Sequence, residues 1–453
     1  MSSKLLFSVA GARGVVGETI DADVVNRLSL AFSSVLPDGP VVVGRDTRPS
    51  GQSFIDSVAG ALCSTGRDVI DVGIAATPTV ELVTEDSDAV GGIIVTASHN
   101  PGNWNALKFL DHRGMLISKE TGDRLFAAFE TNDFATDAAA PGSRREYVDG
   151  NEEHVRGILS LDDVDESRIR ARGFKVVLDC INGAGSVIAP DLLDRLGCSV
   201  VCINCKLDGD FYRDPEPRPE NLTELAERVR SEGADVGFAC DPDADRLALV
   251  DNEGVAISEE YTLALAVDHV LSVSPGPVVV NMSTSSVIDD ICQRHGVDLH
   301  RAAVGEAHVV ARMLATHAVI GGEGNGGVIY PRFHPGRDAL LGIAFVLTLL
   351  AERKCSIRNQ IQEYPLFAIT KEKMGLDGEF SAKRISDLLA DLSPDRIDTQ
   401  DGVKAVFADG WVHLRVSNTE GVVRVIAEGR DERRALALAR QGRDIVAASW
   451  NRS

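Results

Sequence analysis

Pro40-Val-Val-Val-Gly-Arg-Asp46 decides the fold, because it is a short apolar strand that opens into a polar turn and is followed by helical sequence. Two other stretches repeat this design, Lys175-Val-Val-Leu-Asp-Cys-Ile-Asn182 and Pro277-Val-Val-Val-Asn-Met-Ser283. Amphipathic helical sequence follows each of them, at residues 50–64, 186–196 and 284–295. Sheets of parallel strands need such helices on their faces. The repeats therefore predict three similar α/β domains.

The last part of the chain has a different pattern. Strand-like pieces alternate at residues 402–407, 411–415 and 422–427, and a final helix is expected over 431–450. This pattern predicts a smaller C-terminal α+β domain. We expect domain boundaries near residues 150, 253 and 366, which divides the chain into 1–150, 151–253, 254–366 and 367–453.

The composition is that of a globular protein. The chain has 453 residues, of which 44% are hydrophobic and 25% charged, enough for several packed cores. The longest apolar run, Ala339 to Ala351, is too short to cross a bilayer and predicts a buried helix. The start of the chain resembles a folded first strand more than a secretion signal, since Arg13 follows at once. We expect a cytoplasmic protein with no membrane partner.

The charge excludes polyanionic partners. The formal net charge is −22 at pH 7, and no run of Lys or Arg is present, so nucleic acid and anionic membranes would be repelled. A small phosphate ligand would require cations concentrated in Arg-bearing loops.

Eight cysteines in a chain of this length do not form a disulfide framework, which indicates a reduced protein. Cys198, Cys202 and Cys205 are the only tight group. A metal site is conceivable, but the group lies in an apolar strand-like run without a fourth ligand nearby. We expect these residues to be buried as small apolar side chains.

Ser98 ends the apolar strand Gly91-Gly-Ile-Ile-Val-Thr-Ala-Ser98 and is followed by a turn, because the Asn100-Pro101 step prevents a helix. The serine is thus presented at a strand end. Taken alone, a serine in such a turn is far more often an ordinary hydrogen-bonding loop residue, and no Gly-x-Ser-x-Gly elbow supports a hydrolase.

Three carboxylates alternate at Asp241, Asp243 and Asp245. In an extended segment such spacing directs all three toward one point, and hard oxygen ligands at this density suit Mg²⁺. An EF-hand is excluded, because Arg246 and Asn252 stand where that loop needs Gly and Glu. A solvated acidic turn is the remaining alternative, although apolar strands flank the segment.

Two further loops carry binding chemistry. Gly321-Gly-Glu-Gly-Asn-Gly-Gly327 lets the backbone approach a ligand closely, and its carboxylate and amide can bind sugar hydroxyls. In the second loop, Arg415 and Arg424 flank small hydroxyl and amide residues that can form a phosphate-binding nest. A bare glycine turn and an ordinary hairpin are the respective alternatives.

Four motifs occur in the order of the signature loops of the α-D-phosphohexomutase family, and the chain resembles that family along almost its whole length. The motifs are Thr96-Ala-Ser-His-Asn-Pro101, Asp241-Pro-Asp-Ala-Asp-Arg246, Gly322-Glu-Gly-Asn-Gly326 and Arg415-Val-Ser-Asn-Thr-Glu420. Gly44-Arg-Asp-Thr-Arg-Pro-Ser-Gly51 is a further family-like block. The resemblance implies an α/β fold of four domains around a central cleft, three of them related α/β domains with mixed sheets and the fourth a smaller α+β domain.

The resemblance also implies the site residues. Ser98 would be the phosphoserine and would hold one Mg²⁺ through a phosphate oxygen together with Asp241, Asp243 and Asp245. Arg13 and Arg246 would face the transferring phosphoryl group, and His99 and Lys108 are candidates for proton transfer. The substrate would be bound by Glu323, Asn325, Arg415, Ser417, Asn418, Thr419 and Arg424.

This chain departs from the common family pattern at several positions. Pro242 and Ala244 replace glycines, which stiffens the loop without removing a ligand. Asn325 stands where Ser is usual, and Gly327 stands where His is usual, so a sugar contact from that His is absent. Val416 and Asn418 replace the usual Pro and Gly of the phosphate loop.

The implied activity is transfer of a phosphoryl group from the 6-position to the 1-position of a hexose phosphate, with a hexose 1,6-bisphosphate as intermediate and activator. The loop patterns resemble phosphoglucosamine mutases most, with phosphomannomutase or phosphoglucomutase activity as the close rival. A Mg²⁺-dependent sugar phosphatase and a catalytically silent sugar-phosphate-binding protein are further alternatives. The expected partner is a small hexose phosphate, and the expected state is a monomer or homodimer.

Overall fold

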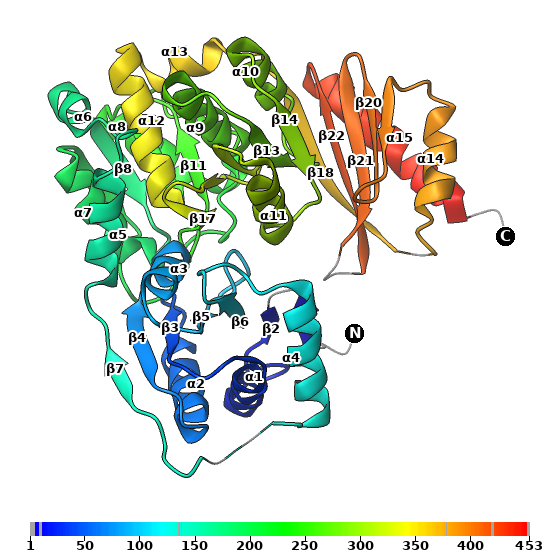
Figure 1. The fold of residues 1–453 in the computed structure, drawn as a ribbon. Coiled ribbons are helices and arrows are strands. Elements are labelled where there is room, and N and C mark those ends of the chain that lie inside the picture. Colours follow the sequence, from blue (N-terminus) through cyan, green and yellow to red (C-terminus); the bar gives the residue numbers. More distant parts are fainter. Residues whose placement is uncertain are drawn as a thin grey trace. The chain divides into compact units, whose positions relative to one another are not determined.

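The computed structural model describes residues 5–8, 11–134, 136, 138–376, 378–417 and 421–450 (Figure 1). The chain divides into two compact units. Unit 1 comprises Met1–Val273 and Asn325–Asn359, and unit 2 comprises Ser274–Gly324 and Gln360–Ser453.

The first sheet of unit 1 has seven strands in the order β1-β2-β6-β5-β3-β4-β7. It is mixed, because β3 runs parallel to β4 and β5, whereas β6 is antiparallel to β5 and β2. The strands are β1 (Leu6–Ser8), β2 (Gly11–Val15), β3 (Val41–Arg45), β4 (Val69–Ile74), β5 (Gly91–Val95), β6 (Trp104–Asp111) and β7 (Arg144–Glu146).

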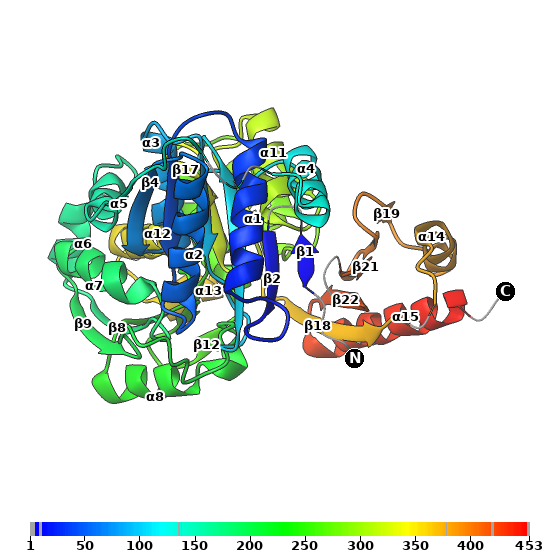
Figure 2. The same cartoon turned by 90° about the horizontal axis from the view of Figure 1, so that it is seen from below.

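Apolar side chains on both faces of β3 explain why helices cover this sheet on both sides. Val41 and Val43 belong to the core beneath α1, α2 and α4, whereas Val42 packs in the core that includes Val80 of α3. Helices α1 and α2 lie side by side on their face of the sheet (Figures 1 and 2). The helices are α1 (Ala22–Val35), α2 (Gly51–Ser64), α3 (Thr77–Asp86) and α4 (Lys119–Thr131).

The second sheet of unit 1 has the order β12-β11-β10-β8-β9 and is also mixed. Its strands are β8 (Lys175–Asp179), β9 (Ser199–Ile203), β10 (Val236–Cys240), β11 (Leu247–Val250) and β12 (Ala256–Ile257). The helices of this region are α5 (Gly150–Leu159), α6 (Glu166–Arg172), α7 (Gly185–Arg195), the 3₁₀ helix η1 (Pro219–Asn221) and α8 (Thr223–Glu232).

The expected burial of the three neighbouring cysteines is wrong for Cys202, which is exposed, and incomplete for Cys198 and Cys205, which are half-buried. The reason is that β9 is an edge strand, with no further strand to cover its outer side. Among the described residues, the aspartate triplet is the only group of three or more potential ligands close enough together to hold a metal ion.

The remaining elements of unit 1 are α9 (Glu260–Val273), the antiparallel pair β16 (Gly327–Tyr330) and β17 (His334–Arg337), and α12 (Ala339–Arg353). The predicted buried helix over 339–351 is confirmed by α12. Asp338 caps this helix by accepting from the backbone N–H groups of Leu340 and Leu341, and its second oxygen lies 2.9 Å from Nε2 of His154.

His334 is a buried cation in unit 1. Its Nδ1 lies 2.8 Å from Oε2 of Glu85, and its Nε2 lies 3.1 Å from Oε2 of Glu81. Burial of the ring disfavours the charged imidazolium, but the hydrogen bonds to the two glutamates outweigh this effect and raise the pKa of His334 to about 9.

We expect the free energy of unfolding to fall as the pH rises through about 9. Because the folded pKa lies above the ordinary value of 6.5, the contribution of His334 is complete below about pH 6.5 and is lost above about pH 9. At 1.36 kcal/mol for each pH unit the contribution is about 3 kcal/mol. Denaturant unfolding of wild type and His334→Gln at about pH 6 and about pH 9.5 measures it. A stability difference that is equal at both pH values would contradict the assignment.

The first part of unit 2 contains parallel strands. Strand β13 (Val278–Asn281) pairs with β14 (Leu299–Ala302) and with β15 (Ile320–Glu323). The helices of this part are α10 (Val287–His295) and α11 (Glu306–Thr316). The strand predicted at residues 277–283 and the helix predicted at 284–295 are thus confirmed.

The C-terminal part of unit 2 is an antiparallel sheet in the order β18-β22-β21-β20-β19, and its apolar face packs against α14 and α15. The strands are β18 (Ala368–Gly375), β19 (Arg396–Asp398), β20 (Val403–Phe407), β21 (Gly410–Val416) and β22 (Val422–Gly429). The helices are α14 (Ala382–Ala390) and α15 (Glu432–Trp450), and α13 (Ile357–Gln362) precedes this sheet in the chain. The α+β prediction is confirmed.

None of the helices in the described ranges combines the length and the apolar character that a membrane span needs.

Candidate active site

Ser98 follows β5 in the turn that the sequence predicts, and its backbone is in the left-handed region at φ 48°. Its hydroxyl donates to Oδ2 of Asp241 over 2.9 Å and lies 3.3 Å from Nδ1 of His99. The structure therefore brings the predicted carrier residue against the predicted metal loop, although 143 positions separate the serine from the aspartate.

Arg48 holds the Ser98 loop through its backbone. Its guanidinium is fully buried and donates to four backbone carbonyls, those of Ser98, Asn100, Pro101 and Trp104. Nε is ion-paired with Oδ2 of Asp46 at 3.0 Å. The sequence placed Arg48 in a family-like block without a role, because only the fold shows which carbonyls it reaches.

We expect Arg48→Lys to destabilise unit 1 by about 2–3 kcal/mol. An ammonium cannot reproduce the planar five-donor fork, so at least one buried carbonyl loses its partner. Denaturant unfolding measures the loss, and Arg113→Lys, which changes an exposed arginine in the turn after β6, is the matched control. An equal, small effect of both substitutions would contradict the role of Arg48 in holding the Ser98 loop.

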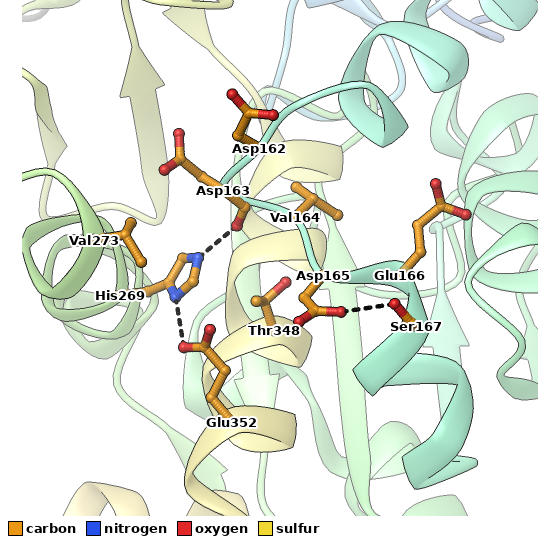
Figure 3. A pocket seen from close by; sticks show the side chains of 10 residues that line it. All are labelled: Asp162, Asp163, Val164, Asp165, Glu166, Ser167, His269, Val273, Thr348 and Glu352. Atoms are coloured by element: carbon orange, nitrogen blue, oxygen red, sulfur yellow. Dashed lines mark hydrogen bonds and ion pairs between the residues drawn. The ribbon is translucent and has the colours of Figure 1, made fainter.

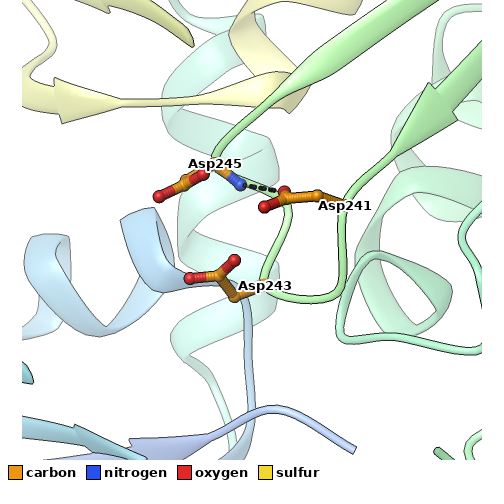
Figure 4. Close-up of side chains that lie close together, drawn as sticks. All are labelled: Asp241, Asp243 and Asp245. Carbon is orange, nitrogen blue, oxygen red and sulfur yellow. Dashed lines mark hydrogen bonds between the residues drawn. The ribbon is translucent and has the colours of Figure 1, made fainter. Parts of the chain in front are cut away.

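Asp241, Asp243 and Asp245 lie in the turn between β10 and β11, and their side chains converge (Figure 4). One oxygen from each lies within 4.8 Å of the other two, and all three residues are buried. The predicted triplet is therefore a cluster in the structure, and the solvated acidic turn is excluded. Ala244, one of the two glycine replacements, has a positive φ of 53°, the conformation that glycine adopts without strain.

The surroundings shift the pKa values of Asp241 and Asp245 in opposite directions. Burial, with the charges of Asp245 and Asp243 adding to it, raises the pKa of Asp241 well above its usual range. Burial also disfavours the charge on Asp245, but the cations of Arg337, Lys108 and Arg246 outweigh it and hold the pKa of Asp245 below its usual range.

Each carboxylate has one oxygen committed to the protein. Oδ1 of Asp241 accepts from two backbone N–H groups, those of Asp245 and Arg246. Oδ2 of Asp243 accepts from Thr77 Oγ1 and from Lys108 Nζ, both at 2.7 Å. Oδ2 of Asp245 accepts from Nη2 of Arg337 at 2.5 Å. Neither Thr77 nor Arg337 was expected from the sequence.

The oxygens left over fit a divalent cation. Oδ1 of Asp243 and Oδ1 of Asp245 are buried and have no hydrogen-bond partner, and Oδ2 of Asp241 faces the Ser98 hydroxyl. Buried carboxylate oxygens without partners are costly unless a cation satisfies them. These two oxygens and Oδ2 of Asp241 give three monodentate carboxylate ligands, a set that suits Mg²⁺.

Three of the predicted basic groups lie near the triplet or the serine loop. Lys108 on β6 contacts Asp243 and Asp245 at 2.7 and 3.3 Å. Arg246 is buried, lies 3.7 Å from Asp245 Oδ1, and its Nε has no hydrogen-bond partner. Arg13 donates to Oδ1 of Asn100 over 3.2 Å.

His99 is kept neutral by its surroundings. Burial first, and then the charges of Arg246, Arg13 and Arg337, lower its pKa well below the ordinary value. A neutral imidazole beside the Ser98 oxygen is able to accept a proton, whereas Lys108 is ion-paired with two carboxylates.

Two residues of the expected sugar loop lie in different units. In unit 1, Asn325 accepts from the N–H of Gly327, and Gly326 accepts from the N–H of Leu247, directly after the metal loop. A side chain at Gly326 is excluded, because its Cβ would lie 2.2 Å from the carbonyl oxygen of Leu247. Glu323 belongs to unit 2.

The Glu323 carboxylate is held inside unit 2. Its Oε1 accepts from Nδ2 of Asn281 and from the N–H of Gly305, both at 2.9 Å. Glu323 is buried, so its orientation is set before any ligand binds.

The expected phosphate loop is a hairpin between β21 and β22. Arg415 and Arg424 are direct cross-strand partners, and Lys373 on β18 is the partner of Arg424 on its other side. Ser417 closes the hairpin by donating its N–H to Val422. Three cations are therefore concentrated along one row of the sheet, and Arg415 is also ion-paired with Asp401 at 3.0 Å. Asn418 and Thr419 lie outside the described residues.

A separate pocket of about 310 Å³ lies in unit 1, lined by residues of α6, α9, α12 and the segment before α6 (Figure 3). His269 donates from Nε2 to the carbonyl of Asp163 and faces Glu352 with Nδ1 at 3.6 Å. Four other carboxylates line this pocket, and no Lys or Arg does. Its charge is unsuited to a sugar phosphate, and none of the expected site residues lies there.

The fold and the site define a phosphohexomutase. Models of all four domains of phosphoglucomutase/phosphomannomutase match the chain: α/β/α domain I at residues 4–136, domain II at 152–254, domain III at 258–367 and the C-terminal domain at 371–445. The chain belongs to this family, whose members are isomerases with three α/β domains and a C-terminal domain.

Curated relatives and a solved structure agree with this assignment. A phosphoglucomutase/phosphomannomutase of Thermococcus kodakarensis is 38% identical over 95% of this chain and 96% of its own length. A probable phosphoglucosamine mutase of Methanopyrus kandleri is 36% identical over 97% of each chain. The crystal structure of a phosphoglucomutase/phosphomannomutase family protein from Burkholderia thailandensis has a TM-score of 0.86 and 29% identity, and covers 97% of this chain and 96% of that one.

Proposed function

We propose that this enzyme converts glucosamine 6-phosphate to glucosamine 1-phosphate through a phosphoserine at Ser98. The observation that carries the proposal is the 2.9 Å hydrogen bond between the Ser98 hydroxyl and a buried carboxylate cluster that fits Mg²⁺. A phosphate on Ser98 would thus stand at the only candidate metal-binding group among the residues the structure describes.

The reaction is two phosphoryl transfers of opposite direction. In the first, the bond from phosphorus to Ser98 Oγ breaks and a bond to the free sugar hydroxyl forms, which gives a hexose 1,6-bisphosphate. The hydroxyl proton passes to a base and from there to the departing Ser98 oxygen. We assign this role to His99, because its Nδ1 lies 3.3 Å from Ser98 Oγ. In the second, Ser98 Oγ takes the other phosphoryl group, and the proton that the serine loses passes through the same residue to the sugar oxygen that is released.

The protein's charges favour this transfer, because phosphoryl transfer depends on positioning and charge compensation. Arg246 and Arg13 would face the oxygens of the transferring group. Bound Mg²⁺, held by Asp241, Asp243 and Asp245, would supply further compensation there. The same hexose bisphosphate, added in small amount, would phosphorylate Ser98 and act as activator.

We assign substrate recognition to Glu323 and Asn325 for the sugar hydroxyls and to Arg415, Ser417, Asn418, Thr419 and Arg424 for the phosphate that is not reacting. The like-charged row of Arg415, Arg424 and Lys373 supports the second assignment and adds Lys373 to it.

The choice of sugar is tested by a substrate panel. We expect kcat/KM to be highest for glucosamine 6-phosphate, in line with the Methanopyrus relative. Phosphomannomutase or phosphoglucomutase activity is the second candidate, favoured by the name of the Thermococcus relative at 38% identity. Glucosamine, glucose and mannose 6-phosphates are each assayed with a catalytic amount of the bisphosphate. A lower value for glucosamine than for either would overturn the choice, and steady release of inorganic phosphate would indicate a phosphatase.

A further inference from the structure

Gly327 is needed for space and not for its backbone conformation. Its φ is not among the positive values of the described chain, so an L-residue could adopt its backbone. A Cβ at this position, however, would lie 2.4 Å from Cδ and 3.0 Å from Cγ of Arg337. Such approaches are too short, so any side chain here would displace the stem of Arg337.

Arg337 uses this space to reach the metal loop. It lies on β17, opposite Ile329 of β16, and its side chain is 9% exposed. Nη2 donates to Oδ2 of Asp245 over 2.5 Å, whereas Lys108 approaches the same oxygen only to 3.3 Å and is more exposed. Arg337 is therefore the closer and more rigid partner of this carboxylate.

The ion pair decides how Asp245 can bind a metal. With Oδ2 committed to Arg337, Asp245 offers only Oδ1, and Asp243 is limited to Oδ1 in the same way by Thr77 and Lys108. Mg²⁺ takes single oxygens in a tight octahedron, whereas Ca²⁺ takes six to eight oxygens and often both of one carboxylate. A site without a bidentate carboxylate disfavours the larger ion.

We propose that Arg337, seated in the space that Gly327 leaves open, is a positioning residue that holds Asp245 as a monodentate ligand and thereby makes the site select Mg²⁺ over Ca²⁺. The inference rests on the proposed function for the identity of the metal. It predicts that residue 327 controls metal choice through Arg337, without touching the metal.

The experiment is a double-mutant cycle read by metal binding and not by turnover. Isothermal titration with MgCl₂ and with CaCl₂ gives the ratio of the two Kd values for wild type, Gly327→Ala, Arg337→Met and the double variant. Loss of a group that orients a metal ligand typically changes affinity about 10- to 100-fold. We expect Arg337→Met to shift the ratio about tenfold toward Ca²⁺, and Gly327→Ala to shift it in the same direction.

The double variant is expected to show the same Kd ratio as Arg337→Met, because both substitutions remove the same ion pair. Additive effects would show that residue 327 acts by another route, such as Asn325 Oδ1, which a Cβ would approach to 3.2 Å, and would overturn the inference. Arg337→Lys keeps the charge and much of the stem and should fall between wild type and Arg337→Met. It serves as the second variant should Arg337→Met not fold.

Gly60→Ala is the matched glycine control, because a Cβ there meets nothing within 4 Å. It should leave the Kd ratio unchanged. A wild-type protein that binds Mg²⁺ but whose ratio is the same in all variants would overturn this inference alone. A wild-type protein that binds neither ion would overturn the proposed function together with it.

Discussion

Ser98→Ala is expected to fold normally and to lose mutase turnover by at least about a thousandfold, because loss of a catalytic nucleophile typically costs that much or more. The substitution removes only an oxygen, and with it the hydrogen bonds to Asp241 and His99. The loop is held by Arg48 through backbone carbonyls, which alanine retains. The measurement is turnover of glucosamine 6-phosphate with catalytic bisphosphate, together with the intact mass of the purified protein.

The mass measurement separates the carrier role from a merely structural one. Wild type incubated with hexose 1,6-bisphosphate should gain one phosphoryl group, and Ser98→Ala should gain none. Ser53→Ala, on the surface of α2, is the matched control and should behave as wild type. Full turnover of Ser98→Ala, or a phosphoryl group still acquired at another residue, would contradict the assignment.

Periodicity predicted much of the fold, because the strands β3, β8 and β13 each carry a run of apolar residues and amphipathic helical sequence follows each of them. The run at 40–46 became β3 and the run at 339–351 became α12. Both elements are predictable from local sequence. A parallel strand buried on both faces is a short apolar run, and a buried helix is a longer one. The domain boundaries near 150, 253 and 366, and the central cleft, stay predictions.

The metal loop was also predictable, since alternate residues of one short segment supply all three carboxylates. Of the groups that restrain it, only Lys108 was expected at the site, through the family resemblance. Thr77 and Arg337 were not, because no local pattern marks an arginine that will reach an aspartate 92 positions away. A cation directly before the apolar run of α12, together with a glycine in place of the usual His at 327, was the only sequence signal.

The cysteine expectation failed for a related reason. Apolar neighbours in the segment 198–205 predict burial, but the position of a strand within its sheet decides how much of it is covered. The sequence does not show that β9 is at an edge. That position follows because β9 pairs only with β8, whose other side is taken by β10 from later in the chain.

The Asp241→Asn variant should become more stable and less active at once. Burial and the neighbouring aspartates raise the pKa of Asp241, so its ionised form disfavours folding at neutral pH. The sign follows from linkage: the penalty is absent at low pH and develops as the pH rises above the usual aspartate range. An amide keeps an oxygen for the N–H groups of Asp245 and Arg246 and removes the charge. We expect a gain of roughly 1–3 kcal/mol in the metal-free protein.

The same change should remove the benefit of the metal. Mg²⁺ stabilises the wild type in proportion to the logarithm of its concentration over Kd, and the variant should lose most of this increment. Turnover should fall at least about a hundredfold, the upper end of what loss of a group that merely orients a ligand costs. Thermal unfolding without MgCl₂ measures the gain in stability, and unfolding with MgCl₂ measures the lost stabilisation by the metal. Asp123→Asn, which changes a surface residue of α4, is the matched control. A metal-free variant less stable than wild type would show that the cluster is restrained mainly by its hydrogen bonds, and that the repulsion among its carboxylates is already offset by Arg337, Lys108 and Arg246.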